Sequence, residues 1–168
     1  MNKVRKITGL ALAFVLIVAA FAGCSSKPKE SEYKSDVSMS ALAEEIMGQI
    51  TFAMTMPIDM TDADASAYIT ESTGLTGDMV SDSAIHVNMM ITADNLWLAE
   101  AKDMDGVEAV KAAFEKQLET VTKSFEQYLP EPLEMAKNGK VVTRGRYVML
   151  IISEDNDKAI ELFESHIK

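Results

Sequence analysis

Residues 140–153, KVVTRGRYVMLIIS, decide how the rest of the chain can fold. Two strand-like runs, 140–143 and 146–153, flank Arg144 and Gly145, and a glycine can adopt the positive φ that a tight hairpin turn requires. Positions 147–152 are all apolar, which is typical of a central strand covered on both faces. The stretch therefore predicts an antiparallel hairpin near the centre of a sheet.

A second hairpin is predicted upstream of the first. Residues 85–92, IHVNMMIT, place apolar Ile85, Val87, Met89 and Ile91 at every second position. A period of two predicts a strand with one buried face. Ala93 and Asp94 form a plausible turn, after which residues 95–102 make a second strand, antiparallel to the first.

Helices are predicted wherever apolar residues recur at steps of three and four. The longest covers residues 104–129, with Asp103 or Asp105 as a cap and with Pro130 and Pro132 ending it. Shorter helices are expected over 39–50, over 62–69, and from Asp155 or Asp157 to the chain end. Residues 51–61, which contain Pro57, are predicted to be a loop.

This order of elements defines an α+β domain, in which strand–strand–helix occurs twice after one or two N-terminal helices. We expect a four-stranded antiparallel sheet with the two later helices packed on one face. The N-terminal helices would cover an edge or part of the other face. Residues 99–115 and 150–164 each run from a strand through an acidic cap into an amphipathic helix, a weak hint of internal duplication.

The first 24 residues have the pattern of a bacterial lipoprotein signal. Three basic residues within positions 3–6 precede an apolar run over 7–22, and Gly23 precedes Cys24. The run is shorter than the roughly 18–20 residues that cross a bilayer, which disfavours the alternative of an uncleaved membrane helix. We expect cleavage between Gly23 and Cys24 and lipidation of Cys24. The protein would then be anchored to the cell membrane on its extracytoplasmic side.

The expected organisation is a signal peptide over 1–23, a lipidated cysteine with a flexible tether over 24–36, and a single domain over 37–168. Residues 25–36, SSKPKESEYKSD, are too polar to bury enough surface to order themselves. Cys24 is the only cysteine, so no intrachain disulfide is available. The fold must therefore rest on its apolar core.

The chain of 168 residues has a formal net charge of −10. Residues 1–23 hold three of its 16 basic residues and no acidic residue, so the part from Cys24 carries 13 basic and 26 acidic residues, a net −13. Such a charge argues against a nucleic-acid partner and against binding along an anionic lipid surface.

Methionines suggest one candidate metal site. Met54 and Met56 have the spacing that soft thioether sites for Cu(I) use, with Met60 close by and His86 able to join them. The simpler explanation is that these methionines are flexible core filler.

Aspartates at 59, 62 and 64 suggest calcium, but the spacing lacks the glycine and the glutamate of an EF-hand loop. Helix capping explains them instead, and it also explains Asp155 and Asp157. We predict no metal site.

No catalytic or cofactor motif is recognisable in the chain. It contains no G-x-S-x-G, no phosphate-binding loop and no G-x-G-x-x-G. His86 and His166 are the only histidines, and we expect them to be solvated or locally bonded. We predict no catalytic residues and no cofactor, and we predict that the protein is not an enzyme.

Two candidate binding surfaces remain. The sheet face away from the helices would present a mixture of polar, aromatic and methionine side chains, namely His86, Asn88, Met90 and Trp97. Alternatively, the N-terminal helices cover this face and make Trp97 a core residue. The sequence leaves both possibilities open, because Leu96 and Leu98 compete with Trp97 for the buried side. Arg144 and Arg146 at the predicted hairpin tip could receive a carboxylate, although such a pair is more often a solvated turn.

The chain resembles a family of small lipoproteins from Gram-positive bacteria that carries only a domain-of-unknown-function label. The resemblance lies in the lipobox, the helix SALAEEIMGQI, the strand pair into AEAKD, the long helix, and the segment SFEQYLPEPLEMAKNGKVVTRGRYVMLIISED. It covers most of residues 36–168. It implies an anchored extracytoplasmic domain and assigns no catalytic residue to this chain.

Together these features predict a non-catalytic protein-interaction or accessory module of the cell envelope. It would contact the membrane through its N-terminal lipid and would bind an unidentified envelope protein, but no nucleic acid. A lipoprotein that binds a small ligand or Cu(I) is the alternative, and a structural domain without a ligand is a third.

Overall fold

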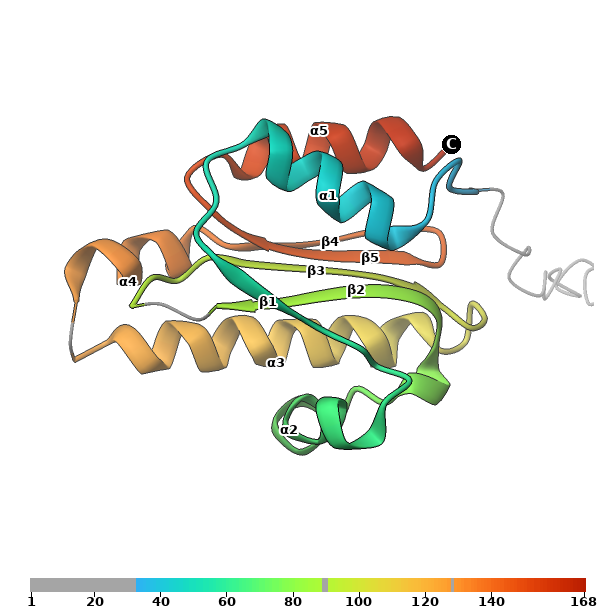
Figure 1. Cartoon of the computed structure of the whole chain (residues 1–168), viewed down its shortest axis with the longest axis horizontal. Coiled ribbons are helices and arrows are strands. Elements are labelled where there is room, and N and C mark those ends of the chain that lie inside the picture. The colour runs from blue at the N-terminus through green and yellow to red at the C-terminus, as the bar shows by residue number, and fades with distance from the viewer. Residues whose placement is uncertain (1–32, 89–90, 128) are drawn as a thin grey trace, which may run out of the picture.

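The computed structural model describes residues 33–88, 91–127 and 129–168, and these residues form three layers with helices on both faces of one sheet (Figure 1). The strands are β1 (Thr55–Ile58), β2 (Val80–Asn88), β3 (Asn95–Ala101), β4 (Lys140–Arg144) and β5 (Tyr147–Ile152). The helices are α1 (Met39–Gln49), α2 (Ala63–Thr73), α3 (Val107–Phe125), α4 (Pro130–Lys137) and α5 (Asn156–His166), with a 3-10 turn at Gly77–Met79.

The sheet has the order β1-β2-β3-β5-β4, and all neighbouring strands are antiparallel. The predicted hairpin is confirmed: β4 and β5 pair around Gly145, which has a φ of 59°. All six residues of β5 are buried, as its apolar sequence predicts. The α+β class and the antiparallel sheet are therefore as expected.

Two differences from the expected architecture concern β1 and α5. Residues 51–61 are not only a loop, because 55–58 add a fifth strand at the sheet edge, where the missing N–H of Pro57 is tolerated. We expected α3 and α5 on the same face of the sheet. Instead α3 packs on one face, and α5 packs on the other face together with α1 (Figure 1). Helices α3 and α5 each bury an apolar stripe, and such a stripe does not specify which face of the sheet the helix covers.

Strand alternation divides the core into two clusters. Trp97 and Leu150 face α3 and pack with Phe114, whereas Leu98 and Met149 face α1 and α5. Because successive strand residues point to opposite faces, each central strand contributes to both clusters. The sheet is consequently covered on both sides.

The long helix ends earlier than predicted, and a second helix follows it. Helix α3 ends at Phe125, and α4 begins at Pro130, whose fixed φ and missing N–H are tolerated in a first helical turn. The prolines therefore separate two helices. Tyr128, part of the predicted stripe, lies outside the described residues.

The two ends of the domain are hydrogen-bonded to each other. The backbone of Lys34 exchanges two hydrogen bonds with that of Lys168, at 2.7 and 2.9 Å, and Ser35 pairs with Ile167. Paired structure thus begins within the stretch predicted as a tether. The predicted signal and Cys24 lie outside the described residues, and no described helix is long and apolar enough to span a bilayer.

Candidate functional site

A cleft opens where β1 separates from β2. Strand β1 pairs only with residues 85–88, so among the described residues no strand lies along the outer side of β2 at residues 81–84. The space beside this edge has a volume of about 480 Å³. We call it the edge cleft. Its lining residues come from α1, from β1 and the connection to α2, from the 3-10 turn and from β2. They are Ser40, Pro57, Ile58, Asp59, Met60, Thr61, Gly77, Val80, Ser81, Asp82, Ser83, Ala84, Ile85 and His86.

One wall of the edge cleft is a turn that Asp59 holds in place. Its Oδ1 accepts hydrogen bonds from the backbone N–H of Thr61 at 2.8 Å and from the Thr61 hydroxyl at 2.7 Å. The hydroxyl, helped by that N–H, holds the pKa of the Asp59 carboxyl below its usual value. Asp59 therefore presents a negative charge at neutral pH, and its turn directs the chain away from β2.

The opposite wall is the start of α1, which is joined to the sheet edge by Asp82. Oδ2 of Asp82 accepts a hydrogen bond from the backbone N–H of Met39 at 2.8 Å. A carboxylate at a helix N-terminus is favoured by the helix dipole. The edge cleft thus has two carboxylates, while its lining contains no lysine or arginine.

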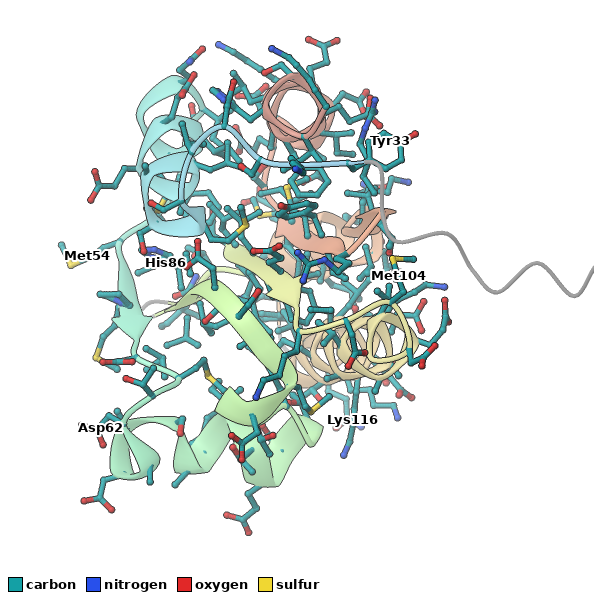
Figure 2. The ribbon with its side chains drawn as sticks, turned by 90° about the vertical axis from the view of Figure 1, so that its right-hand side faces the viewer. Tyr33, Met54, Asp62, His86, Met104 and Lys116 are labelled. Carbon is teal, nitrogen blue, oxygen red and sulfur yellow. The ribbon has the colours of Figure 1, made fainter. Side chains whose placement is uncertain are left out.

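His86 lies at the inner end of the edge cleft, between α1 and the start of α2 at Asp62 (Figure 2). Its Nδ1 lies 3.3 Å from Oγ1 of Thr55. Burial lowers the pKa of His86, and the negative charge of Glu44 partly opposes this shift. The imidazole is therefore mainly neutral at pH 7 and adds a polar but uncharged group to the cleft.

Of the other members of the first predicted surface, Trp97 lies away from His86 and Asn88 does not line the edge cleft. Trp97 has no exposed surface and makes an edge-to-face contact with Phe114 at 5.5 Å, so it belongs to the core. In the strand register Trp97 is opposite Ile85, on the other face from His86. Asn88 bonds to the Thr92 hydroxyl beyond the cleft, and Met90 lies outside the described residues.

The two arginines of the predicted hairpin tip are engaged within the chain. Arg146 donates to the carbonyls of Ala101 at 3.1 Å and Lys102 at 3.0 Å, and it forms an ion pair with Glu100. The Arg144 guanidinium lies 4.9 Å from the centre of the Tyr33 ring, and its Nη1 lies 3.7 Å from a carboxylate oxygen of Glu164. These contacts assign both side chains to the fold itself.

The four residues proposed for Cu(I) are not brought together. Met56 on β1 and Met54 just before it are exposed, and the Met54 side chain points outward (Figure 2). Met60, by contrast, is buried in the core. The register places His86 opposite Pro57 and thus on the other face of β1 and β2 from Met56. Within the described part of the chain, no three His, Cys, Asp or Glu side chains are grouped to hold a metal.

Helix capping by aspartate is confirmed at α2. Asp62 accepts hydrogen bonds from the N–H groups of Asp64 and Ala65 at 2.9 and 3.2 Å. The capping explanation is therefore correct for Asp62.

A second and shallower groove of about 990 Å³ lies between α4 and the start of α5. Its acidic lining is Glu131, Glu134, Glu154, Asp155 and Asp157, with Lys140 and Lys158 among them. Lys158 already donates to the carbonyl of Gln49 at 2.8 Å. Lysines thus lie among the carboxylates of this groove, whereas the edge cleft has carboxylates without basic residues and runs along the uncovered half of β2, so the edge cleft is the better candidate.

Sequence reasoning missed most of the edge cleft. The polar run Ser81, Asp82 and Ser83 stands before the alternating pattern, so the strand was expected to begin only at residue 85. Polar residues in the first half of a strand that ends with apolar alternation are a signal that could have indicated an open edge.

The fold is an α+β domain built on a five-stranded antiparallel sheet, and its candidate site is a strand edge. A family described as Domain of unknown function (DUF4358) matches residues 54–153, more than half of the chain, and the protein belongs to this family. The match runs from β1 to the end of β5 and leaves out α1 and α5. No curated protein and no solved structure has significant similarity to the chain.

Proposed function

We propose that this protein is a lipid-anchored extracytoplasmic module that works by binding another protein of the cell envelope at the edge cleft. The lipoprotein signal that ends at Cys24 supports the location. The observation that carries the binding role is the open side of β2 at residues 81–84, beside a cleft with polar walls. Unpaired strand edges are a common place for one protein to receive another.

The anchor is tested first in cells. Full-length protein produced during growth with labelled palmitate is expected to take up the label and to sediment with membranes, whereas Cys24→Ser should do neither. An unlabelled full-length protein that sediments with membranes would contradict lipid anchoring.

Binding at the edge cleft is tested by photocrosslinking from the anchored protein in its native host. A benzophenone side chain at Ser83 should yield a discrete crosslinked protein, and the same group at the exposed Lys116 on α3 should not (Figure 2). Equal products from both positions, or none from Ser83, would overturn the proposed site.

A small ligand is the second candidate occupant, because 480 Å³ falls within the range of small-molecule sites. A thermal-shift screen of the full-length protein against metals, amino acids and sugars tests this alternative. A saturating ligand at a hundredfold excess over its dissociation constant would stabilise the fold by about 2.7 kcal/mol. We expect no such shift from these compounds.

A further inference from the structure

We infer that the occupant of the edge cleft is an extended, positively charged segment of the partner, which adds to the sheet as a strand beside residues 81–84 of β2. The inference rests on the proposed function and specifies the partner's chemistry. Three observations carry it: the way β1 ends, the charge of the cleft, and the state of the other sheet edge.

The open edge is built by the sequence around Asp59. If β1 continued in register, residues 59–62 would cover residues 81–84 of β2. Instead the turn of Asp59 and Thr61, with a further backbone bond from Asp62 N–H to the Asp59 carbonyl at 3.3 Å, ends the pairing. The four uncovered residues would span about 13 Å in a regular strand, since a strand rises about 3.3 Å per residue. The pairing of β2 with β3 is irregular between Val80 and Asp82, so the regular part of the open edge is 82–84.

The connection after β1 is held away from the open edge from two sides. Met60 is only 4% exposed and lies in the core cluster beneath the sheet. A Cβ at Gly77 would lie 2.4 Å from the carbonyl oxygen of Met60, so the glycine permits this close approach of two backbones. The gap is therefore a fixed part of the fold.

The cleft favours a cationic occupant. Asp59 and Asp82 face it, no basic residue lines it, and the chain from Cys24 carries a net charge of −13. The remaining polar lining consists of the His86 imidazole and of hydroxyls, from Ser40, Ser83 and others, that can bond either to a backbone or to a side chain. A second copy of this acidic chain would bring negative charge to a negative cleft, which disfavours self-association there.

The opposite edge of the sheet, the outer side of β4, also has no partner strand among the described residues, but its charge differs. Strand β4 begins and ends with the basic residues Lys140 and Arg144, and edge charges of this kind hinder further strand pairing. Arg144 is also covered by the Tyr33 ring. The charges thus favour strand addition at β2 over strand addition at β4.

The test uses the full-length protein in detergent micelles and a fluorescent peptide, Ac-Thr-Lys-Val-Lys-Val-Lys-Thr-NH2. One control peptide has glutamate in place of each lysine. The other keeps the lysines but has N-methyl groups on two consecutive central residues, which blocks both hydrogen-bonding edges of a strand. Binding is measured by anisotropy, and hydrogen exchange is followed at residues 81–84.

The lysine peptide should bind and slow exchange at residues 81–84, and neither control peptide should. The double variant Asp59→Asn/Asp82→Asn keeps the acceptor oxygens and should weaken binding about tenfold, on the scale of two exposed charge pairs. The matched variant Glu71→Gln/Glu161→Gln removes two exposed charges on α2 and α5, outside the cleft, and should bind like the wild type.

Equal binding of the N-methylated peptide would overturn strand addition, and equal weakening by the two double variants would overturn the role of the cleft charges. No binding of the lysine peptide would overturn the inference as well. If crosslinking from Ser83 persists in that case, the proposed function survives, whereas loss of that crosslink removes the proposed function itself.

Discussion

Nδ1 of His166 lies 2.6 Å from Oδ1 of Asp36, and this contact joins the last residue of α5 to the segment that leads into α1. Nε2 of the same ring lies 3.1 Å from a carboxylate oxygen of Glu45 on α1. We predicted a solvated or locally bonded histidine, but its partners are far away in the sequence. His166 instead connects three segments at the point where the chain enters the domain.

This connection should weaken in acid. The hydrogen bond to His166 holds the pKa of Asp36 below its usual value of 3.8. A lowered carboxyl pKa adds stability that is present above 3.8 and is lost as the pH falls through the folded-state pKa. We expect the protection of residues 33–36 from hydrogen exchange, relative to the intrinsic exchange rate at each pH, to fall in that range. Asp36→Asn should be less protected than the wild type above this range, should resemble it below the range, and should show no such transition; a transition that persists in the variant would assign it to another group.

Stability should also depend on His86 near neutral pH. Because burial lowers its pKa below 6.5, the unfolded state binds more protons than the folded state just below that value. The stabilising contribution is therefore present above pH 6.5 and is lost as the pH falls toward the folded-state pKa. His86→Gln should flatten the profile of unfolding free energy over this range, as measured by urea denaturation. An unchanged profile would show that another group titrates there.

Phe114 should be among the most costly residues to truncate. It is fully buried and packs edge-to-face on Trp97, so Phe114→Ala leaves a cavity between α3 and the sheet. We expect a loss of about 3–5 kcal/mol in unfolding free energy. Tyr68→Ala, at a residue that is 66% exposed on α2, is the control and should change stability little. Similar losses in the two variants would contradict the assigned core.

The close approach at Gly77 predicts opposite outcomes at two glycines. Gly77→Ala places a methyl group against the Met60 carbonyl and should destabilise the fold by about 1–3 kcal/mol, because backbone atoms cannot easily move aside. Gly48 lies within α1 with open space around its Cβ position, and Gly48→Ala should stabilise by up to about 1 kcal/mol through helix propensity. Thermal unfolding of both variants measures these changes in stability. If Gly77→Ala leaves the unfolding temperature unchanged, the connection after β1 can move.

Arg146 should contribute to stability, although the sequence suggested it as a binding residue. Arg146→Ala removes the donor to the carbonyls of Ala101, at the end of β3, and of Lys102, just after it, and leaves Glu100 without its ion pair. We expect a loss of about 1–3 kcal/mol. The exposed pair of Lys137 and Glu134 supplies the comparison, since Lys137→Ala should cost less than about 1 kcal/mol. Chemical denaturation that ranks the two variants the other way would refute this assignment.

Local patterns predicted the features that depend on local chemistry. The hairpin around Gly145 and the apolar stripe of α3 could be predicted because a turn residue and a periodicity are written in consecutive positions. The position of Trp97 could not be predicted, because residues 96–98 are all apolar and the alternation did not show which of them faces which side of the sheet. Its side was decided by the register with β2, which pairs Trp97 with Ile85.

The edge cleft could not be predicted because it is a relation among three segments. Ser40 comes from the first helix, Asp59 from the turn after β1, and Ser83 from the uncovered half of β2. Each of these residues is an ordinary polar surface residue in its own segment. They come together at one site only because β1 ends early. The sequence did not reveal this short strand, because it contains Pro57 and shows no clear alternation.

The face beneath α1 and α5 has a consequence for how the domain is assembled after synthesis. Its two covering helices are separated in sequence by the whole sheet, yet they close over the same row of side chains, which includes Leu96, Leu98 and Met149. The hairpins need only short loops to form, whereas this face requires segments more than a hundred residues apart to meet. We expect this face to be the last part of the domain to form. Until α5 has been synthesised and has docked, the chain exposes an apolar sheet face that is prone to aggregation and depends on chaperones.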